Sequence, residues 1–534
     1  MEGEAAYQAA GSGIRLAELV GTLSLAVDLG LGQPMEHVAR SALLAARLGE
    51  TIGLGPAERA DLYYVALLGW VGCIADSPES SRRFGDDIAY RAGVFDVDMA
   101  PLPFLGYLLR SAGTGSSAVR RLGTRAALLA TGAAGVKSSL RVHCLVAAEF
   151  AGRLGLGSGV SGPLQQVFAR WDGHGLPAGL GGSRIAVATR LWQLCDVLEV
   201  HHRRGGTAAA LAVAEARSGT QFDPELVAAF TRDAEKLFAE LPAGSAFEAL
   251  IDAEPGLHRR VSGAELDLVL GVLADYADLK APRLRGHSRA VARLAAAAAR
   301  RLGLEPEQVR LLGRAALLHD LGRTGIPNTI LEKDGELDRT EAERLRMLPY
   351  YTERMLAAPA ALREIGQLAA LAHERLDGSG HHRGLNAAMI PLPGRILAAA
   401  NEYQRLREPR PVPHTAEQAA RLLVDQVAAG GMDAGAVDAV LACAGQAPER
   451  RPTGPAGLTA REVQVLVLLA RGATNRQIAA RLGIAPKTAG NHIERIYAKA
   501  GVGSRAAATL FAMRHGLLDR IQELGGPGDG VNTS

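Results

Sequence analysis

Apolar residues recur every three or four positions along most of the chain, and the strict alternation typical of strands is hard to find. Residues 458–520 show the helical pattern most clearly, because they divide into four short amphipathic segments. Two of the helix starts are marked by capping boxes, Thr459 with Glu462 and Thr474 with Gln477. The pattern predicts an all-α protein whose last four helices form a helix-turn-helix unit.

The third of these four helices has a polar face opposite its apolar one. That face carries Lys487, Thr488, Asn491, His492, Arg495 and Lys499. The stretch 458–520 contains ten Lys or Arg against three Asp or Glu, which gives +7, whereas the whole chain carries +3. The other residues together therefore carry 3 − 7 = −4. Because phosphates attract positive charge, we expect binding of double-stranded DNA at this end of the chain alone.

The same stretch resembles the LuxR-type (GerE-type) helix-turn-helix family in its LT-x-RE, Gly-x-x-Asn-x-x-IA and NH-x-x-x-I-Y-x-K patterns. The resemblance implies a homodimer on DNA, with two sets of contacts. Major-groove contacts are implied for Lys487, Thr488, Asn491, His492 and Arg495, and backbone contacts for Thr474, Asn475 and Lys499. Two positions depart from the family, since Ala485 replaces a capping Ser and Gly490 replaces a basic residue.

A second informative stretch runs from about 264 to 445. It contains adjacent His319 and Asp320 near a helix end, with His287 on an earlier helix. Such a mixture of imidazole and carboxylate binds divalent manganese, iron or zinc and can activate water. The segments HDLGRTGIP and HE-x-x-DG-x-G resemble the HD-GYP branch of the HD phosphohydrolase superfamily. The resemblance implies a helical bundle that hydrolyses cyclic dinucleotides, with His319 and Asp320 as the catalytic pair.

Several ligands that the HD-GYP resemblance implies are replaced in this sequence. The retained metal ligands are His287, His319, Asp320 and His373, whereas the replaced positions carry Leu348, Ala372 and Asn401, and Arg323 stands where a Lys is usual. A two-metal site is therefore not expected. Two interpretations remain open: one divalent ion held by the retained residues, with His381 or His382 as further donors, or a hydrogen-bonded polar pair within the core.

The first 240 residues look like a second, more diverged copy of the same unit. GLGPAERADLYYVALLGWVG aligns with GLEPEQVRLLGRAALLHDLG at an offset of 319 − 69 = 250, which places Gly69 and Trp70 at the His-Asp positions. The later motif WDGHGLPAGLGGSRIAVATRL aligns with LDGSGHHRGLNAAMIPLPGRI at an offset of 377 − 172 = 205. The first copy therefore has 250 − 205 = 45 additional residues. We expect these near 74–118, as a surface excursion or a contact arm. This copy retains His143 and Asp196.

Composition and linkers complete the domain plan. The chain has 534 residues, 48% of them apolar, and no apolar run long enough for a membrane span, so a cytoplasmic protein is predicted. Its four cysteines show no metal-binding spacing. The expected parts are a degenerate HD-GYP-like domain (1–240), a second HD/HD-GYP-like domain with a partial metal site (258–445), a linker (446–457) and the LuxR-type domain (458–523).

Together these patterns predict a DNA-binding transcriptional regulator with a sensory or dimerising body. A nucleotide or another small molecule is the expected effector of that body. The alternative is a metal-dependent cyclic dinucleotide phosphodiesterase that carries a DNA-binding head. The sequence leaves both interpretations open, although the replaced ligands favour a body that is not an enzyme.

Overall fold

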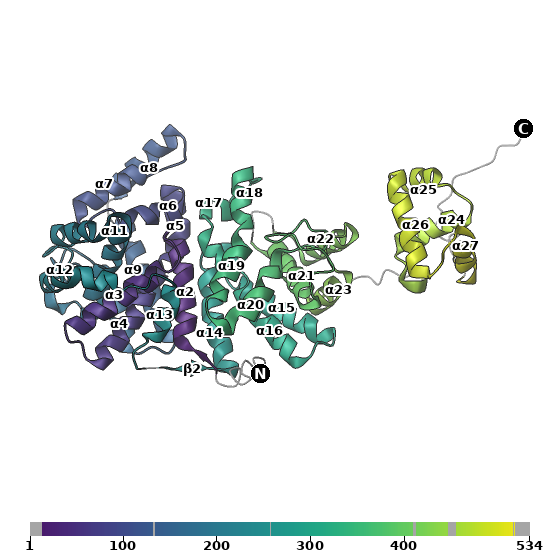
Figure 1. Ribbon diagram of the computed structural model, residues 1–534. Coiled ribbons are helices and arrows are strands. Elements are labelled where there is room, and N and C mark those ends of the chain that lie inside the picture. The colour runs from purple at the N-terminus through teal and green to yellow at the C-terminus, as the bar shows by residue number, and fades with distance from the viewer. Residues whose placement is uncertain are drawn as a thin grey trace, which may run out of the picture. The chain divides into compact units, whose positions relative to one another are not determined.

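The computed structural model describes residues 13–131, 134–256, 258–409, 413–446, 455–515 and 517, and helices dominate it (Figure 1). This confirms the predicted all-α class. The chain divides into two units, Met1–Gln446 and Ala447–Ser534. Most of the predicted linker, residues 447–454, lies outside the described residues, as do residues 518–523 of the predicted LuxR-type domain. Within the described part of the chain, no helix has the length and apolar character needed to cross a membrane.

The first half of unit 1 starts with a short strand and continues as helices. Its elements are β1 (Ile14–Arg15), α2 (Leu16–Gly30), α3 (His37–Thr51), α4 (Pro56–Leu68), η1 (Val71–Asp76), α5 (Ser77–Phe84), α6 (Asp87–Val94), α7 (Pro101–Ser111), α8 (Ala118–Thr131), α9 (Ala134–Arg153), α10 (Ser158–Leu164), η2 (Gly182–Arg184), α11 (Val187–Ala216), α12 (Pro224–Ala239) and α13 (Ala246–Asp252).

The second half has a similar order of helices. Its elements are β2 (Arg260–Val261), α14 (Gly263–Asp278), η3 (Pro282–Leu284), α15 (His287–Arg301), α16 (Pro306–Leu318), η4 (Leu321–Gly325), α17 (Asn328–Leu331), α18 (Arg339–Arg346), α19 (Leu348–Ala357), η5 (Ala360–Leu362), α20 (Arg363–Ala369), η6 (Ala370–His373), α21 (Leu392–Arg407), α22 (Ala416–Ala428) and α23 (Ala434–Cys443). The antiparallel pair β1 and β2 joins the start of the chain to the start of this half.

Helix bounds repeat between the halves at two constant offsets. The starts of α3 and α15 and of α4 and α16 differ by 250 (287 − 37 and 306 − 56), whereas those of α10 and α20 differ by 205 (363 − 158). The close packing repeats as well. A Cβ added to Gly72 would lie 2.2 Å from the His143 carbonyl oxygen, and one added to Gly322 would lie 2.2 Å from that of Leu348. These coincidences support the predicted tandem arrangement of two related bundles.

The additional residues of the first half form two different structures. Helices α7 and α8 project from the body, whereas α5 packs beside α17 of the second half (Figure 1). At that contact the Asp87 carboxylate accepts hydrogen bonds from Lys280 Nζ at 2.7 Å and from the Asn328 backbone N–H at 2.8 Å. The side chains of Asp87 and Lys280 are fully buried. A single apolar core also runs through both halves, from Ile14 to Leu441.

The described residues of unit 2 form four α-helices around a small apolar core, with a short 3-10 turn before them. Its elements are η7 (Pro455–Gly457), α24 (Ala460–Ala470), α25 (Asn475–Leu482), α26 (Pro486–Ala500) and α27 (Arg505–Arg514). Both predicted capping boxes are present. The hydroxyls of Thr459 and Thr474 accept from the backbone N–H groups of Glu462 and Gln477, whose side chains accept from the backbone N–H groups of the two threonines. Gly483, at φ +64°, ends α25 in the left-handed conformation that glycine adopts without strain.

Replacing Asp87 by alanine tests the contact between the halves. We expect the free energy of unfolding of unit 1 to fall by roughly 3–5 kcal/mol, because the change leaves the Lys280 ammonium buried without its partner. Urea unfolding followed by tryptophan fluorescence measures this, since all three tryptophans lie in the first half. Asp96→Ala is the matched control, because Asp96 is half exposed beside Arg204 and its loss should cost less than about 1 kcal/mol. Equal stability of the two variants would contradict the assigned role of Asp87.

Candidate functional site

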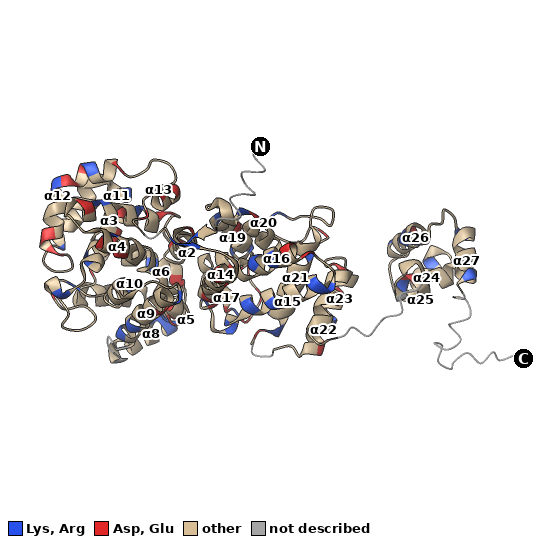
Figure 2. Cartoon of the chain, turned by 90° about the horizontal axis from the view of Figure 1, so that it is seen from below, with Lys and Arg blue, Asp and Glu red and all other residues tan. Residues whose placement is uncertain are grey.

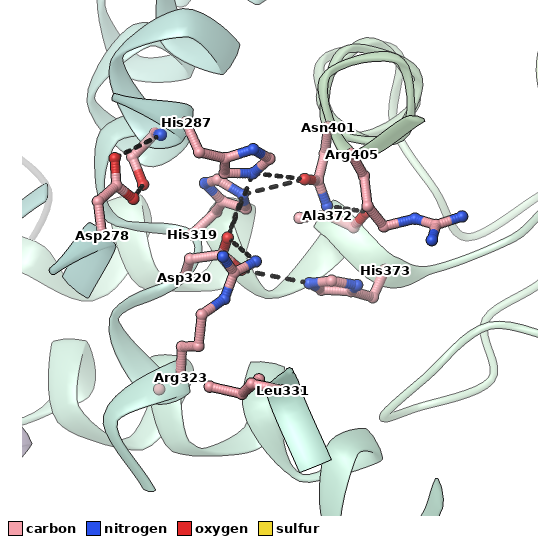
Figure 3. Close-up of polar contacts among 12 residues, drawn as sticks. Asp278, His287, His319, Asp320, Arg323, Leu331, Ala372, His373, Asn401 and Arg405 are labelled. Carbon is pink, nitrogen blue, oxygen red and sulfur yellow. Dashed lines mark hydrogen bonds and ion pairs between the residues drawn. The ribbon is translucent and has the colours of Figure 1, made fainter. Parts of the chain in front are cut away.

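Two histidines and one aspartate meet at the centre of the second half (Figure 3). One ligand atom from each of His287, His319 and Asp320 lies within 4.8 Å of the other two, and all three side chains are buried. The Nε2 atoms of His287 and His319 lie 3.3 and 3.1 Å from the same oxygen, Asp320 Oδ2. The structure therefore brings together three of the four predicted metal ligands.

Helix ends position these three side chains. His287 is the first residue of α15, and the Asp278 carboxylate holds that end of the helix by accepting bonds from the backbone N–H and the hydroxyl of Ser288 at 3.0 and 2.7 Å. His319 ends α16, and Asp320 follows directly before η4. Because α15 and α16 pack against each other, the imidazoles and the carboxylate face one another.

The orientation of the His319 ring makes this centre a site for positive charge. Its Nδ1 lies 2.8 Å from the Ala316 carbonyl oxygen, so this nitrogen carries the proton and donates it. The other nitrogen, Nε2, faces oxygens of Asp320 and Asn401 at 3.1 and 3.2 Å, and must either carry a second proton or bind a cation. Burial lowers the pKa of His319, but the charge and the hydrogen bond of the Asp320 carboxylate together have the larger, opposite effect. The pKa of His319 is therefore raised overall.

Asn401, on α21, completes the ring of donor atoms. Its amide oxygen lies 3.1 Å from His287 Nε2 and 3.2 Å from His319 Nε2, and its amide nitrogen lies 3.4 Å from the Ala372 carbonyl oxygen. The amide oxygen thus occupies the place where a carboxylate of the HD-GYP pattern would stand. It is a neutral and weaker ligand for a divalent cation than a carboxylate.

Arg323 supplies a positive charge within the same centre. It lies on η4, is nearly buried, and its guanidinium pairs with Asp320 Oδ2. Burial alone would raise the pKa of Asp320, but Arg323 and His319 hold it well below its usual value. The aspartate is therefore ionised, and its charge is already balanced by a guanidinium before any metal binds.

These residues fit one divalent ion and lack the ligands for a second. Two imidazole nitrogens, one carboxylate oxygen and one amide oxygen converge, which suits a single manganese, iron or zinc ion. The fourth predicted ligand, His373, is more distant, with its Nε2 3.5 Å from Asp320 Oδ1. His381 stacks on His373, whereas His382 pairs with Glu353. Leu348 and Ala372, at two former ligand positions, are buried apolar side chains.

The predicted DNA-contacting residues of unit 2 are all accessible. Thr474 and Asn475 stand at the start of α25, and the remaining six lie on α26. His492 is partly buried, and the exposed residues are Thr474, Asn475, Lys487, Thr488, Asn491, Arg495 and Lys499. The opposite side of α26 buries Ala489, Ile493 and Ile496 in the core. By contrast, Figure 2 shows basic and acidic residues interspersed over the helices of unit 1.

Two basic residues of unit 2 also have structural partners. Lys499 Nζ lies 2.8 Å from the Glu462 carboxylate, so this ammonium braces α26 against the start of α24. Arg505 donates to the carbonyl oxygens of Leu469 and Ala473, near the end of α24. The N-cap residue of α26, Ala485, provides no side-chain bond, as its sequence predicts. Lys487 and Arg495, in contrast, have no salt-bridge partner among the described residues.

Comparison with known families identifies both parts. A model described as the HD domain matches residues 271–434, and one described as bacterial regulatory proteins of the luxR family matches residues 456–512. The chain combines an HD domain with a LuxR-family domain. The HD match contains the His287, His319, Asp320 and Asn401 centre, and the LuxR match contains the accessible face of α26.

The HD-containing body resembles cyclic dinucleotide phosphodiesterases. A 3'3'-cGAMP-specific phosphodiesterase of Vibrio cholerae is 28% identical over 74% of this chain and 87% of its own length. A cyclic di-GMP phosphodiesterase of Thermotoga maritima is 34% identical over 27% of this chain and 39% of its own length. A crystal structure of a cyclic GMP-AMP specific phosphodiesterase of V. cholerae matches with a TM-score of 0.58 and 25% identity, covering 82% of this chain and 99% of that one.

The first half has a polar centre at the position that corresponds to the HD site. His37, which lies 250 residues before His287, places Nε2 3.2 Å from Asp196 Oδ1 and Nδ1 2.6 Å from Glu199 Oε2. The indole of Trp70 donates to Asp196 Oδ2 at 2.9 Å. His37 was missed in the sequence, although the offset of 250 would have found it. His143 lies apart from this pair, with its Nε2 2.8 Å from the Gly69 carbonyl oxygen.

The His37 centre predicts a pH-dependent stability. Burial lowers the pKa of His37, but the hydrogen bonds with Asp196 and Glu199 raise it to about 10, from an ordinary 6.5. Because the pKa of His37 is higher in the folded protein, its protonated ring stabilises the fold fully below pH 6.5. This contribution of His37 is lost as the pH rises through about 10. We therefore expect unfolding free energies, measured in urea, to fall by a few kcal/mol over this range (on the order of 1.4 kcal/mol for each pKa unit).

The His37→Gln variant should lack this fall, because glutamine does not titrate. His174→Gln is the control, since His174 is exposed and its replacement should leave the wild-type pH dependence in place. An unchanged fall in the His37→Gln variant would show that other groups cause it.

Proposed function

We propose that this chain is a DNA-binding transcriptional regulator whose helical body senses a small molecule and does not hydrolyse it. The accessible polar face of α26 carries this proposal, because its side chains are free to enter a major groove while its apolar side is fixed in the core. The match to the luxR-family model supports it. On DNA the regulator acts as a homodimer that reads two half-sites about one helical turn apart.

The state of the HD centre favours binding over hydrolysis. In a two-metal phosphodiesterase, both ions need protein ligands beside the carboxylate that corresponds to Asp320. Leu348 and Ala372 cannot provide them, and the Arg323 guanidinium already neutralises Asp320. The named relatives act on cyclic dinucleotides, so we propose a cyclic dinucleotide as the effector of the second half. A ligand that binds one arrangement of the body better than another shifts the population toward it.

An active metal-dependent phosphodiesterase is the second candidate function. The convergence of His287, His319 and Asp320 on one point favours it, as do the relatives. In that case the three side chains and Asn401 would hold one ion, and the ion would supply a bound water of lowered pKa. His319 would release its extra proton when the ion binds, so the affinity for metal would rise with pH.

Arg495→Ala tests the DNA-binding face. We expect roughly tenfold weaker binding to a short mixed-sequence duplex, and a slope of log affinity against log salt that is smaller by about one, because one phosphate or base contact is lost. Fluorescence anisotropy at several salt concentrations measures both quantities.

Arg514→Ala is the matched control for this experiment, because Arg514 is an exposed arginine in the last turn of α27, outside the proposed face. It should bind DNA as the wild type does. Removal of residues 458–520 should abolish salt-dependent binding altogether. Retained binding after that truncation would overturn the proposed regulator.

Asn401→Asp tests the metal centre. The change restores a carboxylate beside His287 and His319, so we expect the affinity for manganese to rise by at least about tenfold. Titration calorimetry of the metal-stripped full chain measures it. The control is Asn386→Asp, an exposed turn residue whose replacement should leave manganese affinity unchanged.

Hydrolysis is followed on the same samples with 3'3'-cGAMP and cyclic di-GMP. Under the proposed function the wild type binds at most about one ion and shows no turnover. Turnover by the wild type that is lost in His319→Ala would establish the second candidate function instead.

A further inference from the structure

A cavity of about 550 Å³ lies in the first half, beside Trp70 and Asp196. Helices α7, α8 and α9 form one wall, and α11 with the segment 167–178 forms the other. Most of its lining side chains are aliphatic or aromatic, including Phe168 and Trp192. A cavity of this volume with a mainly apolar lining is typical of sites for small organic molecules.

Arg217 gives this apolar cavity one polar anchor. The residue ends α11, lines the cavity and is only 8% exposed. Its guanidinium contacts the Gln221 amide oxygen at 3.3 Å, and no carboxylate among the described residues lies within ion-pair distance of it. The neighbouring Arg170 differs, because it pairs with both Asp98 and Asp172. Asp98 and Asp96 act on this guanidinium from beyond ion-pair distance, but burial outweighs them and lowers the pKa of Arg217. A buried guanidinium with no direct counter-ion is costly, so the site favours an anion.

The wall opposite α11 exposes large aliphatic side chains of α7 and α8 at the mouth of the cavity. Leu102 on α7 and Leu129 on α8 line the cavity, yet their exposed fractions are 81% and 60%. Large aliphatic side chains at the mouth of a cavity are covered when an apolar molecule enters, which contributes favourably to binding. The cavity therefore presents apolar surface and one buried cationic group, Arg217, to the same occupant, and the exposed Lys137 on α9 also belongs to its lining.

We propose that the first half binds an apolar organic acid, with its single carboxylate on Arg217 and its hydrocarbon body against the α7–α8 wall. A cyclic dinucleotide fits this cavity poorly, because most of the lining is aliphatic or aromatic, whereas the sugars and the two phosphates of such a ligand are polar. The binding site stands on the geometry of the first half alone. Any effect of the bound acid on DNA affinity would rest on the proposed function of the chain, but the binding itself does not.

Binding of decanoate and decanol to the full-length protein tests this site. The two probes share an apolar chain, and only decanoate has a carboxylate. Fluorescence of Trp70 and Trp192, which line the cavity, reports binding, and titration calorimetry measures affinity. We expect decanoate to bind at least about tenfold more tightly than decanol, which is the effect expected of one charge-assisted pair.

Arg217→Gln should remove this preference by weakening decanoate about tenfold while leaving decanol unchanged. Arg204→Gln is the matched control, since Arg204 is an exposed arginine paired with Asp96 and should keep wild-type affinity. Leu105→Trp fills the cavity from α7 and should weaken both probes. Thermal melting of each variant establishes that it is folded, and Arg217→Met, which also removes the charge, replaces the glutamine variant if that fails to fold.

Equal affinity of the wild type for both probes, or no binding of either, would overturn the proposal. So would tight binding of decanoate by a folded Leu105→Trp variant, because the acid would then bind elsewhere. The LuxR-type domain plays no part in these measurements. A failure of DNA binding in the truncation experiment would therefore leave this result unaffected.

Discussion

A carboxylate buried among helices needs hydrogen-bond donors or a positive charge beside it, and the centre of each half of unit 1 meets this condition in its own way. In the first half, Asp196 faces the His37 ring and the Trp70 indole. In the second half, Asp320 faces Arg323 and His319. The first centre holds two carboxylates, because His37 also contacts Glu199, and the second holds Asp320. In both centres, cationic side chains of this chain face the negative charge.

The same condition governs the contact between the halves. Asp87 comes from the additional helices of the first half and meets Lys280 of the second, with both side chains fully buried. Because this ion pair and the shared apolar core tie the halves together, a ligand that repacks one half changes the packing energy of the other. A body built in this way would couple the two proposed ligand sites, one at the HD centre and one beside Trp70, through their shared packing.

Local patterns in the sequence predict much of this structure, and contacts between distant residues account for what is missed. The caps at Thr459 and Thr474 and the His319–Asp320 pair depend on neighbouring residues, so spacing is enough to find them. The offset of 250 also holds for His37, which has no family motif around it. The Asp87–Lys280 pair, however, joins residues 193 apart. Arg217 is likewise an ordinary arginine in the sequence, and only folding places it in a mainly apolar cavity with no carboxylate of the described residues within ion-pair distance.

In this fold, the negative charge that the ligand side chains offer to a metal ion separates a hydrolase from a sensor. A catalytic ion acidifies its water only if it binds tightly, and tight binding needs carboxylates that no protein cation has neutralised. Replacement of an aspartate by Asn401 removes one negative charge, and Arg323 offsets the other on Asp320. The helices that surround the centre pack through apolar contacts, and these contacts do not depend on those charges. The fold that this chain shares with phosphodiesterases does not depend on those charges, which is why we propose that it can serve as a binding body.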